Sequence, residues 1–262
     1  MRKRKHLRIF VAALAPFFAA GASAQQSVVR VAAAADLKFA MAELAKKFRQ
    51  DTGTTVDVTY GSSGNFFSQI QNGAPFDLFF SADVDYPRKL AAAGAAEQAT
   101  LHEYAIGRIV IWVPPDAKPD VARDTWKVLL DSAVQKVAIA NPQHAPYGRA
   151  AVEAMRKANV YESAKPKLVY GENISQAAQF VQSGSAQAGI IALSLAVSPG
   201  MRAGKYWVIP REMHAPIEQA AIVLSAAKNK DGARAFLEFV QGADARQILV
   251  TFGFQLPPVG SR

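Results

Sequence analysis

Small, mostly neutral residues recur in this 262-residue chain at four points where an apolar run gives way to a segment with helical spacing. Backbone N–H groups at a helix start have no partner within the helix, and the positive end of the helix dipole lies behind them, so such positions bind anions without a cationic side chain. Four helix starts brought together would surround an oxyanion with neutral donors. The four segments are Ala35-Asp36, Ser62-Ser63-Gly64, Pro146-Tyr147-Gly148 and Asn173-Ile174-Ser175.

The second of these segments carries the clearest signal. It reads Gly61-Ser62-Ser63-Gly64, in which the hydroxyls add hydrogen-bond donors and the glycines allow close approach of the backbone to a ligand. Ser, Asp and Asn are also ordinary N-cap residues, so helix capping alone explains any one loop taken singly. It is their repetition that favours an anion site.

Enzyme signatures are absent from the sequence. There is no G-x-S-x-G, no Walker lysine after a glycine loop, no H-E-x-x-H and no cysteine, and His102, His144 and His214 lie far apart. We therefore expect no catalysis, no cofactor and no residue that ligates a metal directly. Two alternatives remain open: a hydrolase with Ser63 as nucleophile and His144 as base, and a binder of an organic solute such as an amino acid or polyamine, although the loops lack an aromatic clamp or paired charges.

The first 24 residues are predicted to be a signal peptide. Five Lys and Arg residues lie within the first eight positions, an apolar run covers 9–20, and the small-residue site Ala22-Ser23-Ala24 follows. Cleavage after Ala24 discards those five cations and leaves 25 basic against 21 acidic side chains. The whole-chain pI of 9.8 is therefore no argument for a nucleic-acid partner. No later apolar stretch approaches membrane-spanning length.

Strands alternate with helices along the rest of the chain, a pattern that predicts an α/β fold with parallel sheets covered on both faces. The segment 37–49 has apolar residues at helical spacing and ends before Gly53. Further helices are predicted around Phe66 and over 87–93, 151–158, 175–182, 231–240 and 243–250. Strands are predicted over 28–34, 54–60, 77–81, 109–113, 137–140, 167–170, 188–192, 206–209 and 220–224.

Six segments form a distributed signature: 31–37, 60–64, 72–83, 104–107, 140–148 and 253–254. The run Gly-Ala-Pro-Phe-Asp-Leu-Phe-Phe-Ser-Ala-Asp over 73–83 is the most diagnostic. Through these segments the mature chain resembles, along nearly its whole length, the periplasmic molybdate-binding proteins of ABC importers, particularly the branch whose oxyanion loop reads Ala-Pro-Tyr-Gly.

The resemblance implies a two-lobed periplasmic binding protein fold (type II-like), each lobe a mainly parallel sheet flanked by helices, with the ligand in the interlobe cleft. Lobe I would comprise 25–107 plus 216–262 and lobe II 108–215, closing about crossings near 106–108 and 216–219. The implied ligand is molybdate or tungstate, with phosphate or sulfate as the alternative oxyanions. The implied partner is an ABC permease in the inner membrane, and we expect a periplasmic monomer.

Carried over by position, the resemblance places five residues in the pocket. They contribute the backbone amides near Ala35 and Asp36, the amide and hydroxyl of Ser63, the loop and hydroxyl of Tyr147, and the amide of Ile174. In the family's other branch a tyrosine follows the strand that here ends at Ala192, so this chain lacks that donor.

Asp36 departs from the family pattern, which has an uncharged Ser, Thr or Asn at this place. Two unit charges about 4 Å apart repel by roughly 4 kcal/mol at an effective dielectric of 20, so an ionised Asp36 facing a dianion would oppose binding. Two resolutions are open. Asp36 caps the helix that begins at Leu37 and turns its carboxylate away, or the carboxylate accepts a proton carried by the ligand, as phosphate has near neutral pH and molybdate, tungstate and sulfate do not.

Overall fold

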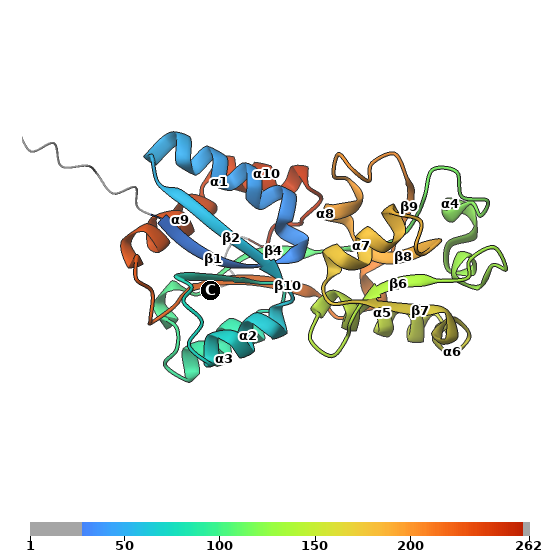
Figure 1. Cartoon of the computed structure of the whole chain (residues 1–262), viewed down its shortest axis with the longest axis horizontal. Coiled ribbons are helices and arrows are strands. Elements are labelled where there is room, and N and C mark those ends of the chain that lie inside the picture. The colour runs from blue at the N-terminus through green and yellow to red at the C-terminus, as the bar shows by residue number, and fades with distance from the viewer. Residues whose placement is uncertain (1–27, 259–262) are drawn as a thin grey trace, which may run out of the picture.

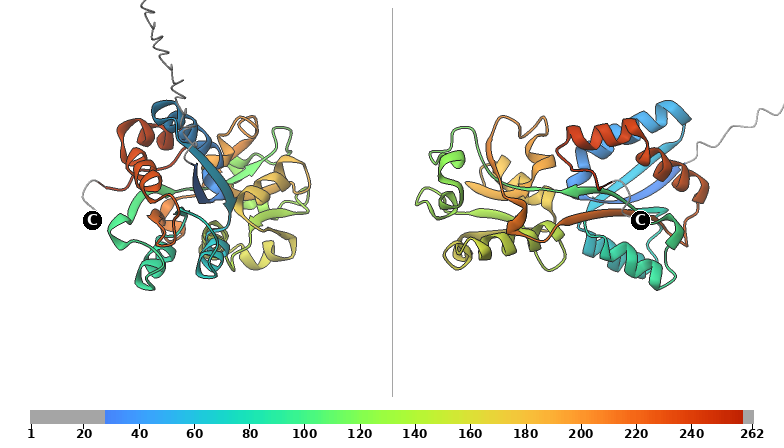
Figure 2. Two further views of the ribbon diagram at one scale, coloured as in Figure 1. Left: turned by 60° about the vertical axis from the view of Figure 1, so that its left-hand side comes forward. Right: turned by 180° about the vertical axis from the view of Figure 1, so that it is seen from behind.

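The computed structural model describes residues 28–258; the predicted signal peptide and its cleavage site after Ala24 lie outside them. Two lobes lie side by side along the long axis of the molecule (Figure 1). Each is built on a five-stranded sheet, and the view from behind in Figure 2 shows the chain crossing between the lobes. No helix within the described range is long and apolar enough to cross a membrane.

The sheet of lobe I has the strand order β2-β1-β3-β10-β4. Strand β1 pairs in parallel with β2 and β3, and β10 pairs antiparallel with both β3 and β4. Four strands therefore point the same way and only β10, which returns from lobe II, runs against them. The strands are β1 (Val28–Ala34), β2 (Thr55–Gly61), β3 (Leu78–Ser81), β4 (His102–Gly107) and β10 (Ile217–Val223).

Lobe II repeats this arrangement with the order β7-β6-β8-β5-β9. Strand β6 is parallel to β7 and β8, and β5, the first strand after the crossing from lobe I, is antiparallel to β8 and β9. Mainly parallel sheets are thus confirmed in both lobes. The strands are β5 (Ile109–Val113), β6 (Val137–Ala140), β7 (Leu168–Gly171), β8 (Ala188–Ala192) and β9 (Lys205–Val208).

Helices cover both faces of the lobe I sheet (Figure 1). The core on one face includes Leu37, Phe48 and Phe236, and the core on the other includes Phe66 and Leu90. Gly53 ends α1 in the left-handed conformation, as its position predicted. The first face carries α1 (Lys38–Thr52), α9 (Lys230–Gln241) and α10 (Ala243–Thr251), and the second carries α2 (Ser63–Gln71) and α3 (Asp85–Ala92); a 3-10 turn η1 (Ala35–Leu37) links β1 to α1.

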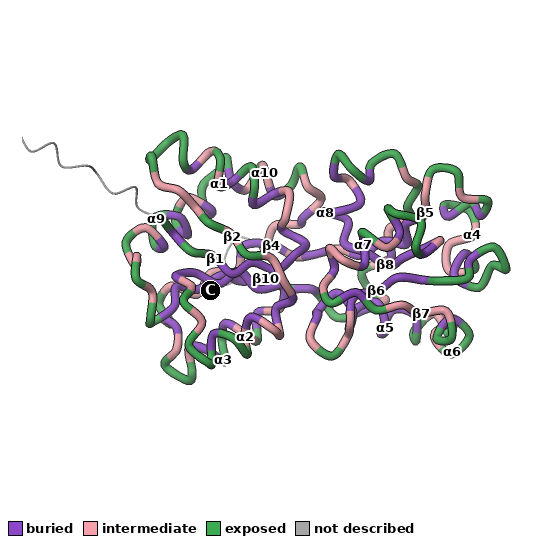
Figure 3. Tube along the Cα trace, viewed as in Figure 1, coloured by how far each residue is buried: buried purple, intermediate pink, exposed green. Residues whose placement is uncertain are grey.

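The core of lobe II extends across the boundary, because its cluster of buried residues includes Ala34, Ala35 and Ala82 of lobe I. Buried residues lie along the strands in the middle of the molecule, while the outer faces of the helices are exposed (Figure 3). The helices of this lobe are α4 (Val121–Asp124), α5 (Pro146–Lys157), α6 (Tyr161–Ala164), α7 (Ile174–Gln182) and α8 (Leu193–Ala196). Short 3-10 turns cover Thr125–Leu130, Lys165–Lys167 and Arg211–Met213 in this lobe, and Gln98–Thr100 in lobe I.

Two of the differences from the predicted elements involve residues of the site. The segment 102–107 forms β4, which alternation alone did not predict, and α5 begins at Pro146 rather than at residue 151. Proline suits the first position of a helix, because its fixed φ is helical and the missing N–H has no partner there. Tyr147 therefore lies in the first turn of a helix.

Candidate oxyanion site

The four predicted loops lie at the carboxyl ends of four strands. Ala35 and Asp36 form η1 directly after β1, and Ser63 is the first residue of α2, which follows β2. In lobe II, Tyr147 lies in the first turn of α5 after β6, and Ile174 is the first residue of α7 after β7. All five residues are buried. Two of the helix starts of lobe II reach lobe I at Asp36, since Tyr147 of α5 donates to it and α7 packs against η1.

Asp36 joins the two lobes. The hydroxyl of Tyr147 donates to its Oδ2 at 2.8 Å, and the amide Nε2 of Gln219 donates to the same oxygen at 2.7 Å. The hydroxyl of Ser194, at the start of α8, donates to the backbone carbonyl of Asp36 at 2.8 Å. Side chain and main chain of this one residue are thus held from α5, α8 and β10.

Gln219 is itself oriented by a second tyrosine. The hydroxyl of Tyr104 in β4 donates to Oε1 of Gln219 at 2.7 Å, which leaves Nε2 to face Asp36 and the hydroxyl of Tyr147, 3.0 Å away. All four side chains are buried. We call Asp36, Tyr104, Tyr147 and Gln219 the floor network.

Burial changes the acidity of the floor network. It raises the pKa of Asp36 from 3.8 to about 6, an effect opposed by the hydrogen bonds from Gln219 and Tyr147 and, more weakly, by the backbone amides of Asp36 and Leu37. Burial and the neighbouring Asp36 carboxylate raise the pKa of Tyr104 and of Tyr147 well above 10. Both tyrosines are therefore neutral donors, and Asp36 is the group in this network that titrates near neutral pH.

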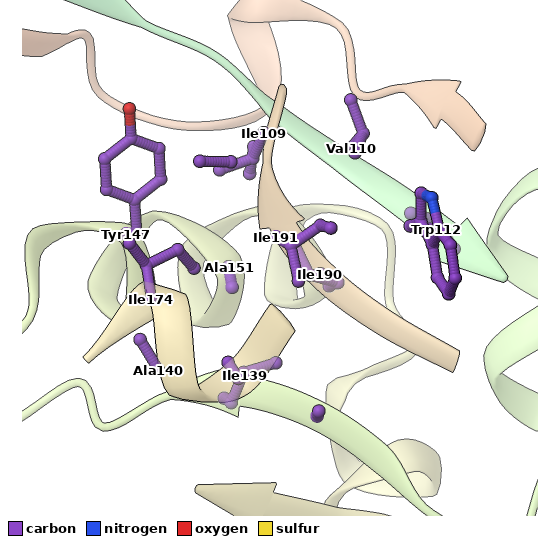
Figure 4. Packing of buried hydrophobic residues seen from close by; sticks show 14 of the residues in the cluster. Ile109, Val110, Trp112, Ile139, Ala140, Tyr147, Ala151, Ile174, Ile190 and Ile191 are labelled. Atoms are coloured by element: carbon purple, nitrogen blue, oxygen red, sulfur yellow. The ribbon is translucent and has the colours of Figure 1, made fainter. Parts of the chain in front are cut away.

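The structure decides against one of the two resolutions offered for Asp36. Oδ2 accepts from Tyr147 and Gln219, and Oδ1 has no hydrogen-bond partner among residues 28–258, so the carboxylate does not cap the helix that follows it. The hydroxyl of Tyr147 donates to Asp36, and its donation to an anion stays a prediction. Figure 4 shows the Tyr147 ring beside Ile174 with its hydroxyl directed away from the apolar cluster of lobe II.

Two glycines make room for this arrangement. A Cβ at Gly107 would overlap the hydroxyl of Tyr147 and approach Nε2 of Gln219 to 2.8 Å. A Cβ at Gly148 would overlap the carbonyl oxygen of Ala140, so the glycine in Ala-Pro-Tyr-Gly lets the first turn of α5 pack on the end of β6.

Ser63 is engaged within lobe I. Its hydroxyl oxygen accepts the backbone N–H of Ala82 at 2.9 Å, while His144 lies 2.9 Å from the hydroxyl of the preceding residue, Ser62, through Nδ1. The nucleophile and base of the hydrolase alternative are therefore not paired.

Polar contacts also cross between the lobes outside the floor network. The N–H of Gly64 donates to the carbonyl of His144 at 2.9 Å, and Asn65 donates to Glu172 at 2.5 Å. Arg149 forms an ion pair with Asp83. Arg149 and Glu172 are partly exposed, with side-chain exposures of 41% and 60%. We call the pairs Asp83–Arg149, Asn65–Glu172 and Ser62–His144 the rim contacts.

A family match and close relatives agree with this geometry. The family described as bacterial extracellular solute-binding protein matches residues 29–255. The chain belongs to that family. It is 39% identical to the molybdate-binding protein ModA of Azotobacter vinelandii over 89% of this chain and 92% of that protein, and 32% identical to ModA of Escherichia coli K12 over 97% and 99%. The solved periplasmic molybdate-binding protein of Azotobacter vinelandii superposes with a TM-score of 0.82 at 31% identity, covering 87% of this chain and 99% of that one.

These relationships confirm the two-lobed periplasmic binding protein fold and identify the chain as an extracellular solute-binding protein rather than an enzyme. Among the described residues, no group of three or more His, Asp or Glu side chains is arranged to hold a metal ion.

Three residues of the site were not predicted as such. Tyr104 and Gln219 lay within segments that sequence reasoning had singled out, as part of the family signature and of the predicted crossing, but neither had a role. Ser194 follows Ala192, where the other branch of the family has its tyrosine, and holds the backbone of Asp36 from the same end of β8. Only the tertiary structure brings these side chains to Asp36.

Proposed function

We propose that this chain is the periplasmic solute-binding component of an ABC importer and that it binds molybdate or tungstate. The main supporting observation is that the first turn of α5 reaches Asp36 through Tyr147, that α7 packs against η1, and that the donors around this buried carboxylate are neutral. The relatives named molybdate-binding proteins support the choice of anion. Ala35, Asp36, Ser63, Tyr147 and Ile174 are the proposed contacts, mainly through backbone N–H groups, and no residue contacts the metal atom itself.

Another tetrahedral oxyanion, phosphate or sulfate, is the second candidate. The specific observation that favours phosphate is Asp36, because a buried carboxylate accepts a hydrogen bond from an anion that carries a proton and repels one that carries none. An organic solute fits less well, because the buried floor offers no pair of opposite charges to hold it.

The remaining assignments complete the proposal. The mature chain begins at Gln25, acts as a monomer and delivers its anion to an inner-membrane permease. Sheet membership changes between Gly107 and Ile109 and again between Val208 and Ile217, so we divide the lobes at 107/108 and 215/216 and place the closing motion there. The mass of the exported protein tests the cleavage site, and its sedimentation tests the oligomeric state.

A panel of anions tests the proposed function. Residues 25–262 are mixed with molybdate, tungstate, sulfate or phosphate, and unfolding is followed by thermal shift. An anion present at a hundred times its dissociation constant should stabilise the fold by about 2.7 kcal/mol. We expect molybdate and tungstate to give the largest shifts. The absence of a shift with all four anions, together with no calorimetric heat, would rule out the proposal.

A further inference from the structure

One oxygen of the floor network has no partner. Oδ2 of Asp36 accepts from Tyr147 and Gln219, whereas Oδ1 is buried; the backbone amides of Asp36 and Leu37 lie near the carboxyl group, but no group of residues 28–258 reaches Oδ1 in hydrogen-bond geometry. A buried polar atom without a partner costs free energy that a ligand or a proton can recover. Oδ1 is therefore the atom of this carboxyl group that is left for the bound anion.

The hydrogen-bond pattern also fixes where a proton on Asp36 would lie. Oδ2 receives two donors, and the orientation of one of them, the Gln219 amide, is set by Tyr104. An oxygen that accepts two hydrogen bonds from fixed donors is a poor site for a proton, since an O–H there would face N–H and O–H groups. The proton of a neutral Asp36 therefore lies on Oδ1.

Among residues 28–258, no cation acts on the pKa of Asp36. The titratable groups that face it are the hydroxyls of Tyr147 from α5 and Tyr104 from β4, both neutral. From α8 and β10 it meets Ser194 and Gln219, and α7, which packs against η1, begins with Ile174 and Ser175. The nearest lysine in sequence, Lys38, lies with its ammonium 5.8 Å from the centre of the Phe39 ring.

We propose that this site takes up its oxyanion together with one proton, which is shared between Oδ1 of Asp36 and a ligand oxygen. The inference rests on the proposed function and deepens it. For a fully deprotonated dianion such as molybdate, the proton comes from solvent and Asp36 becomes a neutral donor to the anion. For hydrogen phosphate, the ligand brings the proton and the ionised Asp36 accepts it. In each case the complex holds one proton more than an ionised Asp36 and a fully deprotonated anion hold together.

The burial that raises the pKa of Asp36 to about 6 sets the pH range of this effect. Above that pH the free protein has lost the proton, so each molybdate that binds must bring one in from solvent. Linkage then requires the dissociation constant for molybdate to rise about tenfold for each pH unit. Binding of hydrogen phosphate needs no such uptake.

Calorimetry on residues 25–262 tests this directly. Molybdate is titrated between about pH 6.5 and 8.5 in buffers with different ionisation enthalpies, which counts the protons taken up on binding. We expect uptake of about one proton per molybdate near pH 8, no uptake with phosphate in the same range, and a roughly hundredfold weaker affinity for molybdate at the upper pH than at the lower.

Asp36→Asn supplies the matched variant. Its amide oxygen can accept from Tyr147 and Gln219 as Oδ2 does, and its NH₂ group places a permanent donor where Oδ1 lies. We expect D36N to bind molybdate with a nearly pH-independent affinity and without proton uptake, and to bind it more tightly than the wild type near pH 8.

The outcomes separate the two proposals. If the wild type binds molybdate with a pH-independent affinity and no proton uptake, the inference is overturned while the proposed function stands. If no anion of the panel binds to either protein, both fall. Should D36N fail to fold, the proton count on the wild-type protein still decides the inference.

Discussion

The floor network and the rim contacts join the same two lobes through different kinds of interaction. The floor network is fully buried and consists of neutral donors around a single acid, Asp36. Apart from the buried Ser62, the residues of the rim contacts are partly exposed, and they include the ion pair between Asp83 and Arg149. Under the proposed function, charges that would attract any anion lie where water screens them, and the buried network would discriminate through hydrogen bonds.

This contrast predicts where substitutions matter. In a buried network, a polar atom that loses its hydrogen-bond partner cannot bond to water in its place, so the substitution costs the free energy of desolvating that atom. At the rim a lost partner is replaced by water. The three predictions that follow are ordered from the buried acid outward and from the largest expected effect to the smallest.

The largest effect concerns the stability of the ligand-free protein at different pH values. In the folded protein Asp36 has a pKa of about 6, whereas its ordinary pKa is 3.8. Between these two pH values the unfolded chain therefore binds fewer protons than the folded protein. Stability contributed by this group is therefore present at low pH and lost as pH rises through 6. The shift of about two units corresponds to roughly 3 kcal/mol.

Urea unfolding of the wild type and D36N between about pH 4 and 7 measures this difference. We expect the free energy of unfolding of the wild type to fall, relative to D36N, by up to about 3 kcal/mol over that range. Asp57→Asn, at an exposed position in β2, is the control and should follow the wild type. If the free energy of unfolding changes with pH in the same way for D36N and the wild type, ionising the buried Asp36 does not destabilise the folded protein.

The second effect removes one donor from the floor. Tyr147→Phe keeps the ring in the apolar cluster of lobe II but leaves Oδ2 of Asp36 with Gln219 alone. This hydrogen bond favours the ionised form of Asp36 and is worth about 1 to 3 kcal/mol, so its loss makes the proton that accompanies molybdate easier to take up, and we expect molybdate affinity near pH 8 to rise roughly tenfold. Tyr170→Phe, at an exposed tyrosine of β7, should bind like the wild type in the same calorimetric titration. Equal affinities for the two variants would remove Tyr147 from the binding machinery.

The two regions also differ in how far sequence reasoning could reach them. The helix starts that bear Ser63 and Ile174 were predictable, because strand, loop and helix follow one another locally. The partners of Asp36 were not, since Gln219 lies 183 residues away and reaches it only after the chain has crossed twice between the lobes. Its place in an antiparallel strand depends on sheet order, which local periodicity does not determine.

The same reason explains why the sequence left two roles open for Asp36. From sequence, an aspartate just before a helix is an N-cap, because that is what local geometry favours. Tertiary contacts override this preference here: two donors, from β10 and α5, hold the carboxylate, and Gly107 leaves the space in which they meet. Fold class and family could therefore be predicted, while the chemistry of the one acid inside the site required the structure.

The smallest effect lies at the rim. Arg149→Met removes the charge that pairs with Asp83 but keeps a long apolar stem over the neighbouring Tyr86 ring. Exposed ion pairs contribute about 0.2 to 1 kcal/mol, so we expect molybdate affinity to change by less than about fivefold, and the change to shrink as salt is raised. Calorimetry at low and high ionic strength measures both quantities. A loss of tenfold or more, or one that salt leaves unchanged, would mean that Arg149 acts on the anion itself and that the division between a charged rim and a neutral floor is wrong.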